Sequence, residues 1–200
     1  MKLKKIIAAT ICGLAFIGAA QATPVTYTNS AAWLASTSAV STANFNSGSD
    51  QVYRGPSYTE SGVNFTANSS IYSIYDISYD ASYHSSGYLD MEGSVYGMSF
   101  GSNINALSFD FGGFYNDAVN LNITLSNGET FSVTSPSSGY GFFGITTDTA
   151  FNSLSISTTN PYTAFDDVSY GTAAVPEPAS LALVGLGFAG LVASRRRKAK

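Results

Sequence analysis

Apolar and polar residues alternate with a period of two along most of residues 23–171, as in strands that bury one face of a sheet. The clearest case is VNLNITLSNGETFSVT, where the apolar residues of 119–125 alternate with Asn and Thr. Asn127 and Gly128 then supply a tight turn before Phe131 and Val133. The pattern predicts a hairpin with one solvated face.

Shorter runs of the same kind recur, separated by Gly, Ser, Asn and Pro. They predict strands at Val63–Ala67, Ile71–Ile74, Tyr88–Met91, Tyr96–Phe100, Ala106–Phe111, Phe142–Thr146, Ser153–Ser157 and Phe165–Tyr170. Regular spacing with turn signals predicts an all-β fold, an antiparallel β-sandwich. One short helix is expected in NSAAWLAS, with Asn29 or Ser30 as its cap and with Trp33 and Leu34 on one side.

The first 22 residues have the three parts of a secretory signal peptide: a basic start, an apolar run over 6–20, and small residues in Ala20-Gln21-Ala22. We expect cleavage after Ala22. Cys12 is the only cysteine and lies in this segment, so the exported form has no disulfide, no cysteine nucleophile and no thiolate metal site. Packing must stabilise the body instead.

The other end of the chain holds a second targeting signal. Residues 179–193 are apolar or small apart from Ser180, and a basic segment over 195–200 follows. We expect a short transmembrane helix over 179–194 with the basic segment in the cytoplasm. Residues 172–178 form the linker that precedes it.

The order of Pro176-Glu177-Pro178, an apolar helix and Arg195-Arg196-Arg197 resembles the PEP-CTERM sorting signal of Gram-negative bacteria. In that family the helix holds the exported protein in the inner membrane, and an exosortase-type enzyme processes it near the Pro-Glu-Pro motif. The resemblance implies a membrane-anchored intermediate and a route to the cell surface or extracellular matrix.

The body over residues 23–171 also resembles the jelly-roll domains that PEP-CTERM proteins carry and, more distantly, carbohydrate-binding modules. The matching pieces are ANFNSG, SGVNFTA, ALSFDFGG, YGFFGI and TAFDDVSYG. This resemblance supports a fold rather than a ligand.

Charge separates the body from the two ends. Of the nine Lys and Arg residues only Arg54 lies between 23 and 174, whereas every acidic residue except Glu177 lies there. Such a body repels phosphate backbones, so a nucleic-acid partner is not expected.

Cations suit an acidic body better, and calcium prefers oxygen ligands such as those of Asp166 and Asp167. The resemblance to carbohydrate-binding jelly rolls implies a structural calcium at Asp167 and Asn46, where the last strand meets the N-terminal segment. The alternative is that Asp166 caps the strand start and Asp167 bonds to backbone amides inside the sandwich.

The sequence shows no set of residues that is typical of a catalytic site. Residues 97–101, GMSFG, match the G-x-S-x-G pattern, but strand-like sequence follows Ser99 and the only histidine, His84, lies upstream in a polar loop. A pair of carboxylates could still act on a glycan. We expect a non-catalytic body and keep a secreted glycan-active hydrolase as an alternative.

Tyrosines crowd the segment from Tyr72 to Tyr88, with Tyr75, Tyr79 and Tyr83 between them. They could stack on sugar rings, or they could pack in the core and anchor loops. The sequence therefore predicts an exported β-sandwich with a structural or adhesive role. A carbohydrate-binding module is the other non-catalytic alternative.

Overall fold

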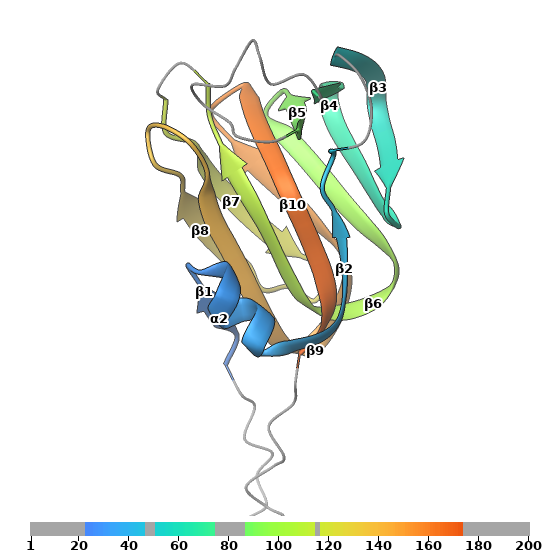
Figure 1. Ribbon diagram of the computed structural model, residues 1–200, viewed down its shortest axis with the longest axis vertical. Helices are drawn as coiled ribbons and strands as arrows, with labels where there is room; N and C mark the ends of the chain where they lie inside the picture. Colours follow the sequence, from blue (N-terminus) through green and yellow to red (C-terminus); the bar gives the residue numbers. More distant parts are fainter. Residues whose placement is uncertain (1–22, 47–50, 75–86, 115–116, 174–200) are drawn as a thin grey trace, which may run out of the picture.

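The computed structural model describes residues 23–46, 51–74, 87–114 and 117–173. These residues form an antiparallel β-sandwich with one short helix (Figure 1). The elements are β1 (Val25–Tyr27), α2 (Ser30–Ala35), β2 (Thr37–Ala43), β3 (Gln51–Glu60), β4 (Val63–Ile74), β5 (Tyr88–Glu92), β6 (Val95–Gly112), β7 (Asn120–Leu125), β8 (Thr130–Thr134), β9 (Gly141–Thr158) and β10 (Tyr162–Ala173).

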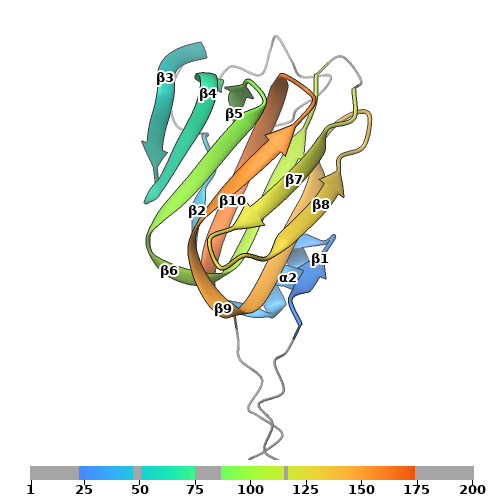
Figure 2. The same ribbon diagram turned by 180° about the vertical axis from the view of Figure 1, so that it is seen from behind.

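Two layers of strands share the long strands β6 and β9. In the front layer of Figure 1, β10 pairs with residues 106–112 of β6, and residues 141–146 of β9 pair with β6 and β1. In the back layer, which faces the viewer in Figure 2, residues 95–99 of β6 pair with both β4 and β9. The register of β6 against β9 shifts between Ser99 and Ile104, where both strands pass from one layer to the other.

The core lies between the layers and is rich in aromatic rings. Phe109 is at its centre, with ring centroids 5.3 Å from Phe143, 5.5 Å from Phe165 and 5.8 Å from Phe111. All four side chains are buried, and they come from β6, β9 and β10. Apolar burial of this kind stabilises the body without cross-links.

The all-β prediction is confirmed. The eight shorter predicted strands each lie within a strand of the structure, and the first hairpin strand, predicted over 119–125, is β7, which begins at Asn120. Six of the predicted strands form three pairs, and the two members of each pair are parts of one longer strand: β4, β6 or β9. The Asn127-Gly128 turn joins β7 to β8, with Gly128 at φ 93°. The sequence patterns missed β1, β2 and β3, because few of their residues are buried and the alternation is weak.

Helix α2 begins where the sequence predicted, but only one of its two large side chains is buried. The Asn29 side chain accepts a hydrogen bond from the Ala32 N–H at 3.1 Å and caps the helix. Trp33 is 1% exposed, and its indole N–H donates to the Ile145 carbonyl at 3.0 Å. Leu34 is 53% exposed, so the prediction that both side chains face one way is wrong. Adjacent helix positions lie about 100° apart around the axis. Of these two side chains, only Trp33 therefore faces the sandwich, and Leu34 faces solvent.

Several sequence predictions fall on residues outside those described: the signal peptide with Cys12, the linker from residue 174 onward with its Pro-Glu-Pro motif, the 179–194 helix and the arginines. Among the described residues, no helix has the length and apolar character needed to cross a membrane.

We expect Trp33→Phe to lower the free energy of unfolding by about 1–3 kcal/mol, because the Ile145 carbonyl loses its buried donor and the ring becomes smaller. Leu34→Ala should change it by less than about 0.5 kcal/mol, because the side chain is mostly in solvent. Urea unfolding of both variants tests this, and equal losses would contradict the assigned packing of α2.

Candidate functional site

The outer face of the front layer, the face turned away from the core, carries a row of residues in direct register. Tyr53 of β3 lies opposite Tyr72 of β4, and Tyr72 lies opposite Asp90 of β5. Asp90 in turn lies opposite Ala164 of β10. Residues paired across strands project on the same side of a sheet, so these four side chains share one face.

Aromatic rings remain accessible on this face. The Tyr53 and Tyr72 ring centroids are 5.3 Å apart, and Tyr53 is 61% exposed. Tyr162 lies two positions before Ala164 on β10, opposite Glu92 of β5, and it is 46% exposed. We call Tyr53, Tyr72, Asp90, Glu92 and Tyr162 the tyrosine face.

A second aromatic group lies beside the tyrosine face, and its members are buried or half-buried. Ile74, Tyr88 and Ala164 are buried there, and Tyr72, Phe114 and Tyr140 pack against them. The ring centroids of Tyr88 and Phe114 are 5.9 Å apart. Tyr88 therefore has a packing role, which is the alternative reading of the tyrosine-rich segment.

Acidic side chains continue the outer face across β10 and β6. Asp166 is 3% exposed, lies opposite Asp110, and accepts a hydrogen bond from the Asp167 N–H at 2.7 Å. Burial, together with the negative charge of Asp167, raises the pKa of Asp110 to about 6. Burial also raises the pKa of the Tyr140 phenol, and the charge of Asp166 adds to the effect.

The predicted calcium ligands occupy different surroundings from those expected. β10 begins at Tyr162, so Asp166 and Asp167 lie within the strand, where the register against β6 shifts after Asp166. The alternative that Asp166 caps the start of the strand is therefore wrong. Asp167 has a φ of 47°. The Asn46 carboxamide oxygen accepts the Gly87 N–H at 2.9 Å. Within the described ranges no group of three acidic, histidine or cysteine side chains could hold a metal ion, and the calcium site stays a prediction.

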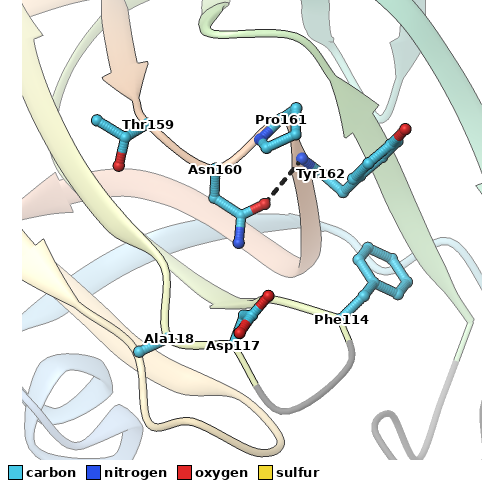
Figure 3. A pocket seen from close by; sticks show the side chains of 7 residues that line it. All are labelled: Phe114, Asp117, Ala118, Thr159, Asn160, Pro161 and Tyr162. Carbon is cyan, nitrogen blue, oxygen red and sulfur yellow. Dashed lines mark hydrogen bonds between the residues drawn. The ribbon is translucent and has the colours of Figure 1, made fainter.

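A pocket of about 430 Å³ lies at the end of the front layer where β9 turns into β10 (Figure 3). Its lining residues are Phe114, Asp117, Ala118, Thr159, Asn160, Pro161 and Tyr162. Tyr162 belongs both to this pocket and to the tyrosine face, so the two are continuous. Volumes of about 300–1,000 Å³ are usual for small-molecule sites.

Ser99, the nucleophile candidate of the G-x-S-x-G pattern, lies inside β6. It is paired with Asn64 on one side and with Ser153 on the other, and its side chain is exposed. A nucleophile elbow requires a sharp strand-to-helix turn, which this position is not. His84 lies outside the described residues, as do Tyr75, Tyr79 and Tyr83.

Of the five tyrosines in the predicted ligand-binding segment, the structure therefore places only Tyr72, which is half-buried, and Tyr88, which is buried. The patterns missed Tyr53 and Tyr162, because one lies on an unpredicted strand and the other just before the predicted start of the last strand. Asp117 and Asn160 lie in connections between strands. No periodicity marks such positions, and they come near the tyrosine face only because they line the same pocket as Tyr162.

We predict that the raised pKa of Asp110 makes its contribution to the free energy of unfolding larger at pH 4.5 than at pH 7.5. The folded-state pKa lies above the ordinary 3.8, so the folded chain binds the proton more tightly between pH 3.8 and about 6. The Asp110 contribution to the free energy of unfolding is therefore fully present below that window and is lost as the pH rises through it. Asp110→Asn should raise the urea midpoint at pH 7.5 and flatten its pH dependence.

Asp148→Asn removes an exposed acid and serves as the control for Asp110→Asn. A lower midpoint for Asp110→Asn at pH 7.5, or a pH dependence identical to that of the unmodified chain, would contradict the assignment.

Comparison with solved structures finds carbohydrate-binding modules. The chain is 17% identical to one variant of CBM29-2, a family 29 carbohydrate-binding module, with a TM-score of 0.34 and coverage of 70% of this chain and 99% of that one. A second variant gives 16% identity, a TM-score of 0.32 and coverage of 78% and 99%. The chain is also 12% identical to PfGH50B, with a TM-score of 0.31 and coverage of 70% and 24%.

No curated protein matches the chain. The family model of the PEP-CTERM protein-sorting motif does match, over residues 174–198. The chain therefore carries a PEP-CTERM protein-sorting motif, which marks it as an exported protein, next to an antiparallel β-sandwich body.

Proposed function

We propose that this exported protein is a non-catalytic adhesin that binds extracellular polysaccharide through the tyrosine face. An exosortase-type enzyme would process its C-terminal tail at the inner membrane. The body would then reach the cell surface or the polysaccharide matrix, where the sandwich attaches to glycan chains.

The exposed Tyr53 ring beside Tyr72, on the same sheet face as Tyr162, carries the proposal. Two tyrosines of this layer keep about half or more of their surface in water. The C–H face of a sugar ring is apolar and can cover such rings, while Glu92 lies nearby to accept hydrogen bonds from hydroxyl groups.

The arrangement of carboxylates favours binding over cleavage. A glycosidase needs two carboxyl groups on opposite sides of the scissile bond. Among the described residues that line the pocket, Asp117 is the only carboxylate. Asp110 and Asp166 lie side by side on neighbouring strands of one sheet face instead of across a cleft.

The position of the tyrosine face also suits an anchored protein. β10 runs from Tyr162, at the tyrosine face, to Ala173, where the described chain ends before the sorting motif. Twelve residues of strand span roughly 35–40 Å. In Figure 1 the two ends of the described chain leave the sandwich at the end opposite to β5. A chain held by its tail would thus present the tyrosine face away from the membrane.

We expect Tyr53→Ala to weaken polysaccharide binding about two- to tenfold, the loss of one aromatic stacking contact. Affinity electrophoresis in gels that contain the extracellular polysaccharide of the producing cell measures the effect. Val95→Ala is the matched control, because Val95 is 45% exposed and lies on the outer face of the back layer. Unchanged binding by Tyr53→Ala, or an equal loss of binding in Val95→Ala, would contradict the proposal that the tyrosine face binds polysaccharide.

Removal of the tail tests the sorting route. A chain that ends at Ala173 lacks the whole sorting motif and is expected in the soluble periplasmic fraction. The complete chain should lose mass from the tail when it reaches the surface, and should remain membrane-bound at full tail length in cells that lack the exosortase-type enzyme. Identical fractionation and mass in both strains would contradict processing of this tail.

A further inference from the structure

The pocket at the β9–β10 turn has two kinds of walls. Phe114 and Tyr162 present aromatic rings on one side, next to Pro161 (Figure 3). Asn160 and Asp117 present polar groups on the other, and the side-chain nitrogen of Asn160 points toward the carboxylate of Asp117 across the space between them. The pocket therefore combines a stacking surface with a donor and an acceptor.

Local hydrogen bonds fix the orientation of the Asn160 carboxamide. Its oxygen accepts the Tyr162 N–H at 3.0 Å, and the Asn160 N–H itself donates to the Thr158 hydroxyl at 3.1 Å. Because the oxygen is held by the backbone, the NH₂ group is the part that faces the pocket. Asn160 can thus donate to a hydroxyl group without rearrangement of the turn.

The backbone holds Asp117 as well. The Asp117 N–H donates to the Phe114 carbonyl at 3.0 Å. A Cβ atom at Gly113 would lie 2.2 Å from the Asp117 carbonyl oxygen, so the glycine allows this close return of the chain. The turn places the Asp117 carboxylate and the Phe114 ring on the same pocket.

Charge around the pocket is negative. Glu92 lies opposite Tyr162, and Arg54 is the only cation of the sequence between residues 23 and 174. The Arg54 Nε donates to the Ser73 hydroxyl at 3.0 Å, and the guanidinium lies 4.8 Å from the centre of the Tyr58 ring. Arg54 is thus engaged away from the pocket, which favours a cationic ligand over an anionic one.

We propose that this pocket binds a hexosamine residue with a free amino group within a glycan chain. The sugar ring lies on Phe114 and Tyr162, its ammonium group pairs with Asp117, and Asn160 donates to a ring hydroxyl. Aromatic faces and a carboxylate both attract an ammonium group, and a uronate in the same place would be repelled. This inference rests on the proposed glycan-binding function and names the sugar class at one end of the tyrosine face.

The experiment uses the full chain in detergent micelles at pH 5.5, where most of the sugar amino groups are protonated. Isothermal titration calorimetry with a β1,4-linked glucosamine tetramer should give saturable binding, and the fully N-acetylated tetramer should bind at least about tenfold more weakly. A lysine tetrapeptide of the same charge should also bind at least about tenfold more weakly, because it has no ring to stack. If the N-acetylated tetramer or the lysine tetrapeptide binds as tightly as the glucosamine tetramer, the proposal is overturned.

Three variants locate the site. Asp117→Asn and Tyr162→Ala should each weaken binding of the glucosamine tetramer about tenfold. Asp148→Asn makes the same change of charge at an exposed position where β9 bends, at the other end of the sandwich, and should leave binding unchanged. If Asp117→Asn and Asp148→Asn weaken binding equally, the tetramer responds only to the net charge of the protein, and the assignment of the site to the pocket is overturned.

Tyr53→Ala separates this inference from the proposed function. Loss of polysaccharide binding in Tyr53→Ala with no effect of Asp117→Asn on the tetramer overturns the hexosamine pocket and keeps the adhesin. Absence of any glycan binding by the unmodified chain overturns both.

Discussion

The long antiparallel pairing of β6 with β9 joins the two layers of the sandwich. Each strand has 18 residues, and the two remain partners in both layers, from Val95–Ser157 at one end to Phe111–Gly141 at the other. Their inward residues alternate and supply much of the aromatic core. Because a slip of one residue would turn every inward side chain outward, this register is strongly specified.

The tyrosine face follows from that register. β10 pairs with the front part of β6, and β5 then pairs with the first residues of β10. β4 crosses from β6 to β5 and carries β3 with it at the edge of the layer. Tyr53 and Tyr162, more than one hundred residues apart in the sequence, thereby come to one face.

Local pattern predicted the strands because alternation and turn residues act within a few positions. The β7–β8 hairpin and the Asn29 cap are of this kind, and both are confirmed. The face and the pocket depend instead on which strands become neighbours, and that is decided by long-range packing. Tyr162 shows the difference. Its candidate role in binding depends on Glu92, which lies opposite it on β5, and on Phe114, which lines the same pocket, and not on its neighbours in the sequence.

The proposed function places glycan on the outer face of the front layer. Hydrogen–deuterium exchange of the full-length protein, with and without the extracellular polysaccharide of the producing cell, tests it directly. Glycan bound to the tyrosine face should slow exchange in residues 51–55, 71–74, 88–92 and 160–164, with little change in β7 and β8. Protection confined to β7 and β8, or no protection at saturating polysaccharide, would contradict it.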